Sequence, residues 1–290
     1  AYSPVRAADL DREATDYDIW LPTLGAGYHF TEELHAHASY GRTFIRPYSY
    51  LPLVNLYNAN RSAFQAKGIN LQQLFDGYDI EESDTVDLGL RFTRGWFEMD
   101  STLFYGKHKN LLTTIYDPRV NLNYQQNIGK AAGYGLDVEM NATFSDTFSV
   151  FVNPSWTTMT YDEDLMYAGN RLAADGNQVV DTPEWLVKTG IVYHPGNFEI
   201  IPMVRFQGKR YSDVENRGEV GSNAIADLRL IYTLPNIMKA KALKVALDLT
   251  NLFDKEYIAV INASDDTRDG QATYYQGAPF AAMLSANLEF

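Results

Sequence analysis

An alternation of apolar and polar side chains with a period of two residues constrains the fold of this chain more than any other feature. In the last segment, Phe280, Leu284 and Leu288 fall on one face, while Met283 and Glu289 fall on the other. The alternation recurs upstream, and we expect these residues to share the apolar faces: Leu88, Leu90, Leu136, Val138, Leu228, Leu230, Leu243 and Leu247. The pattern indicates β-strands with one apolar and one mixed-polar face.

Short and long connections alternate between the strands. We expect about eleven strands, at residues 18–30, 33–45, 82–93, 96–116, 122–143, 147–162, 181–195, 197–216, 222–234, 242–261 and 273–290. The connections 31–33, 94–95, 145–146 and 195–196 are short, whereas 46–81, 163–180 and 262–272 are long. Two connections depart from this pattern: 117–121 is short on the long-loop side, and 235–241 is of medium length on the short-turn side. This asymmetry predicts an all-β fold, an antiparallel transmembrane β-barrel. The alternative is a water-soluble sandwich, whose strands would average about 5–6 residues.

The composition narrows the class of protein. The chain has 290 residues, no cysteine and a net charge of −13. The lack of cysteine excludes a disulfide framework and thiolate metal sites, and the negative charge argues against nucleic acid as a partner. No signal peptide is visible in residues 1–20, and the longest uncharged run, 271–288, alternates as a strand does.

The odd number of strands argues against a complete barrel. Bacterial single-chain barrels have an even number of strands, which places both chain ends on the short-turn rim. Here residue 290 would lie on that rim, and residues 1–17 on the long-loop rim. Unpaired strand edges are not tolerated in lipid. We therefore expect the strands near 18–30 and 273–290 to pair with another segment and not with each other.

Six short motifs resemble those of one family, in the family's order. They are the runs 39–47 (SYGRTFIRP), 82–92 (ESDTVDLGLRF), 127–137 (NIGKAAGYGLD), 181–183 (DTP), 251–257 (NLFDKEY) and 275–279 (YQGAP). Together they cover nearly the whole chain, which resembles the TonB-dependent outer-membrane receptors. Phe280 departs from the pattern, because the family often has arginine after the last motif.

The resemblance implies a fold, a location and partners. Residues 1–290 would form the C-terminal half of a 22-stranded plugged barrel, with the plug and the earlier strands outside this chain. The implied protein lies in the Gram-negative outer membrane and is not an enzyme. It would import a scarce solute, most often a ferric siderophore, with energy from the TonB–ExbB–ExbD complex. The resemblance implies no cofactor.

Tyrosine and arginine gather in the expected outer loops, where they are candidates for ligand binding. The candidates are Tyr48, Tyr50, Tyr57, Tyr161, Tyr167, Arg171, Tyr211, Arg217, Arg268 and Tyr274. Aromatic faces and arginine suit an anionic, ring-bearing iron chelate. Tyrosine also forms the interfacial girdle of such barrels, which is the structural alternative for each of them.

Ionic residues of both signs fall on the polar face of the strands. They are Asp87, Arg91, Asp137, Glu139, Arg205, Asp227, Arg229, Lys244 and Asp248. Isolated charges in apolar surroundings would cost several kcal/mol each. We expect them to line the lumen and to hold the plug.

Other candidate sites are weaker. His35 and His37 share a face near the short-turn rim, where contact with the plug is favoured over metal binding. The run 265–270 lacks the glutamate of a calcium loop, Gly129-Lys130 lacks the rest of a phosphate loop, and no catalytic triad motif occurs. No metal site is predicted.

Several functions stay open at this point. A receptor for cobalamin, haem, another metal or a glycan is the alternative within the class, and a passive pore or structural surface barrel is the alternative outside it. We expect replacement of Arg171, Arg217 and Arg268 to weaken binding of an anionic chelate, and replacement of His35 and His37 to leave affinity unchanged.

Overall fold

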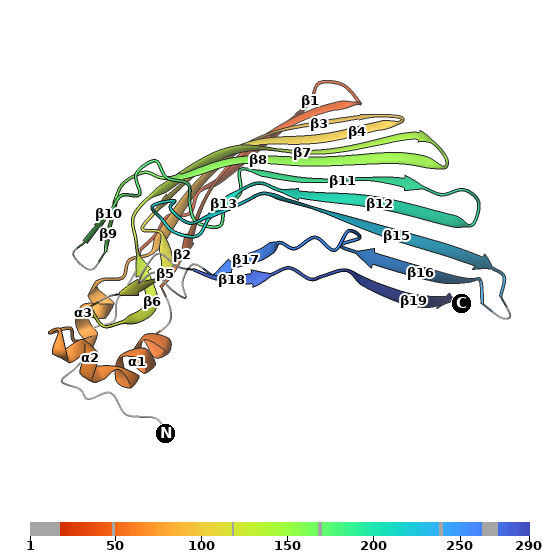
Figure 1. Cartoon of the computed structure of the whole chain (residues 1–290). Helices are drawn as coiled ribbons and strands as arrows, with labels where there is room; N and C mark the ends of the chain where they lie inside the picture. The colour runs from red at the N-terminus through yellow and green to blue at the C-terminus, as the bar shows by residue number, and fades with distance from the viewer. Residues whose placement is uncertain (1–17, 48–49, 118, 168–169, 238–239, 263–271) are drawn as a thin grey trace.

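One strongly curved antiparallel sheet forms most of the molecule in the computed structural model, which describes residues 18–47, 50–117, 119–167, 170–237, 240–262 and 272–290 (Figure 1). Its eleven strands are, in order across the sheet, β1 (Thr23–His29), β2 (Leu34–Ile45), β3 (Glu81–Arg94), β4 (Phe97–Lys109), β7 (Ala131–Ser145), β8 (Phe148–Tyr161), β11 (Trp185–Tyr193), β12 (Phe198–Gln207), β15 (Asn223–Pro235), β16 (Ala242–Thr250) and β19 (Ala281–Glu289). The predicted eleven-stranded antiparallel sheet is confirmed. β1 and β19 are its two edges and do not pair with each other.

The remaining described elements gather at the end of the sheet opposite the short turns (Figure 1). They are the hairpins β5 (Leu112–Asp117) with β6 (Leu122–Asn127), β9 (Leu165–Tyr167) with β10 (Asn170–Leu172), β13 (Arg210–Tyr211) with β14 (Glu219–Val220), and β17 (Ile258–Asn262) with β18 (Thr273–Gln276), and the helices α1 (Tyr50–Ala59), α2 (Arg61–Ala66) and α3 (Leu71–Asp76). None of the helices in the described part of the chain has the length and hydropathy to cross a bilayer.

The five longest strands predicted from the sequence are wrong in extent, because the structure has two separate strands in place of each. Residues 96–116, 122–143, 197–216, 242–261 and 273–290 each contain a strand of the main sheet and a strand of an outer hairpin. Asn110 and Gly129, at the root of the β5–β6 hairpin, and Asn251, after β16, have positive φ angles of 54°, 127° and 49°. A left-handed residue interrupts an extended strand.

The strand register places the predicted apolar residues on one continuous face. Leu88 pairs with Leu103, which in turn pairs with Leu136, and Leu230, Leu247 and Leu284 form an equivalent row. Many of these side chains are open, for instance Leu284 at 73% exposure. Such a band is typical of strands that contact lipid acyl chains.

Aromatic rings border this band at both ends. Towards the short turns, the ring pairs are Phe92–Phe97, Trp96–Phe144 and Phe198–Tyr232, and towards the outer loops they are Tyr134–Trp156 and Trp156–Trp185. On β4, Phe97 and Tyr105 are eight residues apart, and at about 3.3 Å per residue they are about 26 Å apart along the strand. The two girdles therefore fit the two interfaces of a bilayer.

Candidate functional site

The motif 251–257 folds into a turn that binds the start of the last strand. Buried Asn251 donates from Nδ2 to the carbonyl oxygens of Lys255 and Ala278, at 2.9 and 3.0 Å. The Asp254 carboxylate accepts a 2.8 Å hydrogen bond from the backbone N–H of Phe280. The two terminal motifs of the chain are thus one structural clasp, which sets where β19 begins.

A buried arginine ties three outer segments together. The side chain of Arg210 is 2% exposed and donates to Asp181 Oδ1 at 2.7 Å. Its second terminal nitrogen donates to the carbonyl oxygen of Ile258 at 2.8 Å. Asp181 has a positive φ angle of 56° and its N–H donates to the Tyr211 carbonyl. This arginine therefore joins the segment before β11, the β13–β14 hairpin and the β17–β18 hairpin.

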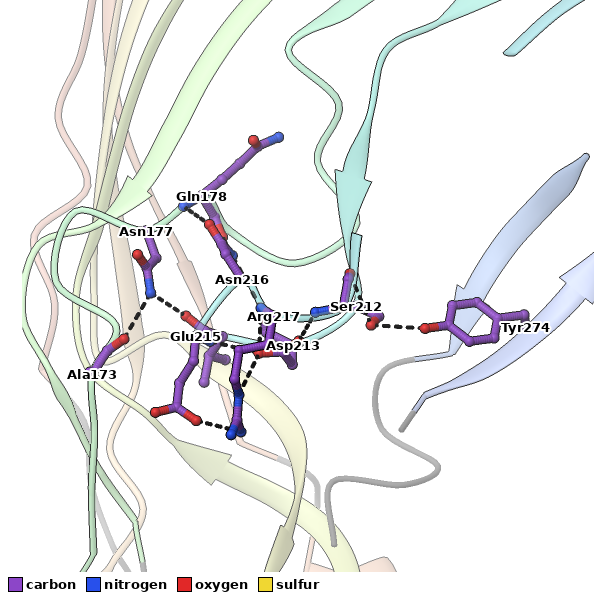
Figure 2. Close-up of polar contacts among 11 residues, drawn as sticks. Ala173, Asn177, Gln178, Ser212, Asp213, Glu215, Asn216, Arg217 and Tyr274 are labelled. Carbon is purple, nitrogen blue, oxygen red and sulfur yellow. Dashed lines mark hydrogen bonds and ion pairs between the residues drawn. The ribbon is translucent and has the colours of Figure 1, made fainter. Parts of the chain in front are cut away.

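Asparagine and tyrosine side chains add further links between the same segments (Figure 2). Asn216 accepts a hydrogen bond from the Gln178 N–H at 2.8 Å and donates to the Gln178 carbonyl at 2.9 Å. Asn177 donates to the Val214 carbonyl at 3.0 Å, and the Tyr274 hydroxyl donates to Ser212 Oγ at 3.0 Å. Because partners come from three loops, we call the described residues of these loops, 161–167, 170–184, 208–222, 251–262 and 272–280, the tied loops.

The helices and the β5–β6 hairpin form a second outer unit, which we call the cap, with its own apolar core. Leu53, Val54, Tyr57, Phe64, Leu71, Leu74, Val120 and Tyr124 are all buried in it. At the hairpin tip, the fully buried carboxylate of Asp117 accepts hydrogen bonds from Arg119, at 2.7 Å, and from Tyr124, at 2.7 Å. Burial opposes ionisation of Asp117, but these hydrogen bonds outweigh it and hold its pKa below the ordinary value.

Two of the tyrosines predicted to bind ligand are in apolar cores. Tyr57 is fully buried in the cap, with its ring 5.4 Å from that of Phe64. Tyr161 is 3% exposed beside Leu165 and Ala174, and burial raises its pKa to about 12. Neither phenol ring is open to a ligand in this structure.

Of the other residues predicted to bind ligand, some lie outside the described part of the chain and some have described side chains. Tyr48 and Arg268 lie outside the described residues, as do the side chains of Tyr50 and Tyr167. Tyr274 is 42% exposed. Half-buried Tyr211 accepts a 3.0 Å hydrogen bond from Lys209.

Both exposed arginines of the prediction already have carboxylate partners. Arg171 forms an ion pair with Asp164 in its own hairpin. Arg217 pairs with Glu215 at 2.5 Å and lies 3.9 Å from Asp213 (Figure 2). Arg217, Tyr211 and Tyr274 all lie in the tied loops. The guanidinium groups of Arg171 and Arg217 are not free to pair with a ligand, because each already pairs with a carboxylate of the protein.

The predicted lumenal residues all lie on the face opposite the apolar band, where most pair across strands. Arg91 donates to Asp100 at 2.8 Å, Arg205 to Asp227 at 2.9 Å, and Arg229 lies 3.4 Å from Asp248. Asp87 accepts from Ser39, Asp137 accepts from Ser155, and Lys244 lies 3.9 Å from Glu289. Glu139 is opposite Asp100 in the register. These pairs make the inner face polar without a large charge of one sign.

Three inner-face glycines each lie beneath an aromatic ring of the neighbouring strand. A Cβ atom at Gly135 would be 2.5 Å from Phe104 Cζ, and one at Gly190 would be 2.7 Å from Phe151 Cζ. A Cβ atom at Gly89 would overlap the ring of His37. The rings lie against the sheet where a side chain would otherwise stand.

The structure adds His29 to the pair His35 and His37, which the sequence already places on one face. The rings of His29 and His35 are 4.3 Å apart between centroids, and His37 is 5.9 Å beyond His35. His108 contacts both Ser83 and Glu81 through the same nitrogen, Nδ1. A Ser-His-Glu relay needs both ring nitrogens, so this trio is not one. No metal-binding cluster of three acidic or histidine residues occurs in the part of the chain that is described.

Arg210, and its pairing with Asp181, are what sequence reasoning missed. The DTP motif marked Asp181, but its partner is 29 residues away and no periodicity relates the two. Only the strand order, which places β11 beside β12, brings them together.

A sheet with one lipid-like face, two aromatic girdles, short turns at one end and folded loops at the other defines an outer-membrane β-barrel protein. The family model described as TonB dependent receptor-like, beta-barrel matches residues 2–252. The chain therefore belongs to the TonB-dependent receptor β-barrel family, and the expected outer-membrane location is confirmed.

Known proteins agree with this assignment. The ferrichrome outer membrane transporter/phage receptor of Escherichia coli (strain K12) is 28% identical over 131 residues, which are 45% of this chain and 17% of that protein. The ferric yersiniabactin uptake receptor of Yersinia pestis superposes with a TM-score of 0.66 at 17% identity, over 93% of this chain and 37% of that one. The unliganded ferric citrate transporter gives 0.69 at 20% identity, over 93% and 38%. A copper transporter gives 0.67 at 12% identity, over 92% and 39%. The chain spans under two-fifths of each.

Proposed function

We propose that this chain is the C-terminal part of the barrel of a receptor that binds a ferric siderophore outside the cell and imports it with energy from the TonB–ExbB–ExbD complex. The family assignment supports the energy source. The names of the relatives support the ligand, since those reported above include transporters or receptors for ferrichrome, ferric yersiniabactin and ferric citrate.

The tied loops support the proposal that the ligand binds at the outer end of the sheet. A binding surface must hold its groups in place, because ordering them on binding costs affinity. Arg210 and the asparagines link the loops through hydrogen bonds of the protein itself. They hold Tyr211 and Tyr274 at the outer end of the sheet, above a polar inner face.

The lumenal face supports the proposal for the plug. Its charges are largely paired across strands, so a folded plug can contact it through hydrogen bonds without having to neutralise a strong field. We propose that Asp87, Asp137 and Glu139, which have no cationic partner among the described residues, hold donors of the plug.

Uptake of iron by cells that carry the complete receptor tests this function. We expect radioactive iron to accumulate when supplied with a ferric siderophore, and accumulation to stop when TonB is deleted. Uptake that continues without TonB would favour a passive pore. Competition by cobalamin, haem or a glycan, with no effect of ferric siderophores, would favour the alternative ligands.

A further inference from the structure

The tied loops are rich in carboxylates. They hold 11 aspartate and glutamate residues against 5 lysine and arginine residues. Residues 161–184 alone contain six carboxylates and one arginine. A ligand that approaches these loops therefore meets a negative field.

The arginines do not offset this field for an incoming anion, because the protein uses them itself. Three arginines of the tied loops are described: Arg171 pairs with Asp164, Arg210 with Asp181, and Arg217 with Glu215. Arg210 is also buried. An anionic ligand would have to displace a carboxylate that is already in place.

Several exposed carboxylates are left over. Asp162, Asp175, Glu184 and Glu256 are exposed and have no ion-pair partner within 4.0 Å among the described residues. The tied loops thus present carboxylates outward while their arginines are internally bound.

Two lysines near the outer end of the sheet are directed elsewhere. Lys107 and Lys109 lie on β4 at positions that alternate with inner-face His108 and continue the row of Leu103 and Tyr105. Their side chains therefore belong to the face that carries the apolar band, not to the lumenal face. These two lysines therefore do not reverse the negative field that a ligand meets at the tied loops.

We propose that the tied loops select ferric chelates that carry little or no net negative charge. This inference rests on the proposed function and narrows its substrate class. It differs from the sequence-based expectation of an anionic chelate, which was drawn from the presence of tyrosine and arginine in the loops and not from the partners of the arginines. Three hydroxamates, each with one negative charge, balance ferric iron and give a neutral complex. Three catecholates, each with two, give a complex of charge −3.

Association rates of these two probes with the complete receptor test the proposal. We expect the rate for a ferric tris-hydroxamate to stay constant from about 20 mM to about 500 mM salt, and the rate for a ferric tris-catecholate to rise as salt screens the repulsion. The double variant D162N/D175N should speed association of the trianion roughly twofold at low salt and leave the neutral complex unchanged. Asp146→Asn, in the exposed short turn at the opposite end of the sheet, is the matched control and should change neither rate.

The outcomes separate this inference from the function on which it rests. Association of the trianion that slows as salt rises, or a double variant that leaves its rate unchanged or lowers it, would overturn the charge selectivity while ferric siderophore transport stands. Failure of both ferric complexes to bind would instead overturn the ferric siderophore function, and the inference with it.

Discussion

His37 and Gly89 show how single residues shape the inner face. The imidazole lies over the glycine because nothing projects from the Cα atom there, and a methyl group would overlap the ring. Gly41 is also on the inner face, on β2, but a Cβ atom at that position would meet no atom within 4 Å. The two glycines therefore differ in environment although both lie in regular strands.

We expect Gly89→Ala to destabilise the barrel by about 1–3 kcal/mol, because the His37 ring must leave its place. Gly41→Ala is the control and should have little effect. Thermal unfolding of the complete receptor in detergent measures both. The double variant H37A/G89A should recover most of the loss, and a loss that persists in it would contradict the overlap as the cause.

Arg210 has an effect well beyond its own loop. Replacement by methionine removes the hydrogen bonds to Asp181 and to the Ile258 carbonyl. Hydrogen bonds to a charged group contribute about 1.5–3 kcal/mol each, so amide exchange in residues 177–182 and 258–262 should become at least about tenfold faster. Arg171→Met is the control, since its partner Asp164 lies in the same loop. Unchanged exchange in 258–262 would show that the loops are not tied through Arg210.

At the scale of elements, the hairpin β5–β6 depends on an ionised carboxylate. The pKa of Asp117 is lower in the folded state than in the unfolded chain, so its ionisation stabilises the cap above the ordinary carboxyl range and this stabilisation is lost as pH falls through the folded pKa. Hydrogen exchange of residues 112–127, corrected for intrinsic rates, should show constant protection from pH 7 to pH 5 and a loss only below about pH 4.

Asp117→Asn is the variant that tests this dependence. It should lower the protection of the hairpin at pH 7 by about 1–3 kcal/mol and remove the change at low pH. Asp76→Asn, on α3 of the same cap, is the control. A wild-type hairpin that loses protection between pH 7 and pH 5 would assign the transition to another group.

Proline positions show the limits of strand prediction. Because proline removes a ladder donor, the sequence predicts that Pro154, Pro202 and Pro279 lie at bulges or outside paired stretches. Pro279 does lie between β18 and β19, but Pro154 and Pro202 lie inside β8 and β12. The β7–β8 ladder is interrupted between the pairs Asp137–Ser155 and Met140–Val152, which spans Pro154. The β11–β12 ladder is likewise interrupted between Gly190–Met203 and Tyr193–Ile200. Both strands continue through the proline. The ladder is interrupted on only one side of each strand, since Pro154 still pairs with Val187 on β11 and Pro202 with Leu228 on β15.

The strands were predictable because their signal is local, whereas most of the site was not. A period of two residues is visible in any ten-residue window, and it gave both the strands and their faces. The helices of the cap also had a local signal, the helical spacing of Leu53, Val54 and Tyr57, which the expectation of a long loop overlooked. The partners of Arg171, Arg210 and Arg217 depend on how distant loops fold together, and no spacing in the sequence shows this.

At the scale of the whole molecule, the two faces of the sheet should differ sharply in their tolerance of charge. Val138 is near the middle of the apolar band and Glu139, the next residue, is on the inner face. We expect Val138→Arg to cost about 2–4 kcal/mol in a bilayer, and Glu139→Arg to cost far less. Equilibrium unfolding of the complete receptor in lipid vesicles compares them, and equal costs would contradict the assignment of the faces.

The rings that cover inner-face glycines have a consequence for how this barrel can vary over evolutionary time. A larger residue at Gly89, Gly135 or Gly190 leaves no place for the ring above it, and a smaller residue in place of the ring uncovers the backbone. Gly89 and its partner ring, His37, should therefore be exchanged together among natural variants of this chain. Gly135 and Gly190 should stay glycine whichever ring covers them, because a Cβ atom there would also meet the backbone carbonyl oxygens of Trp156 and Pro202. The free width of the barrel would then vary at the Gly89–His37 pair and stay fixed at the other two.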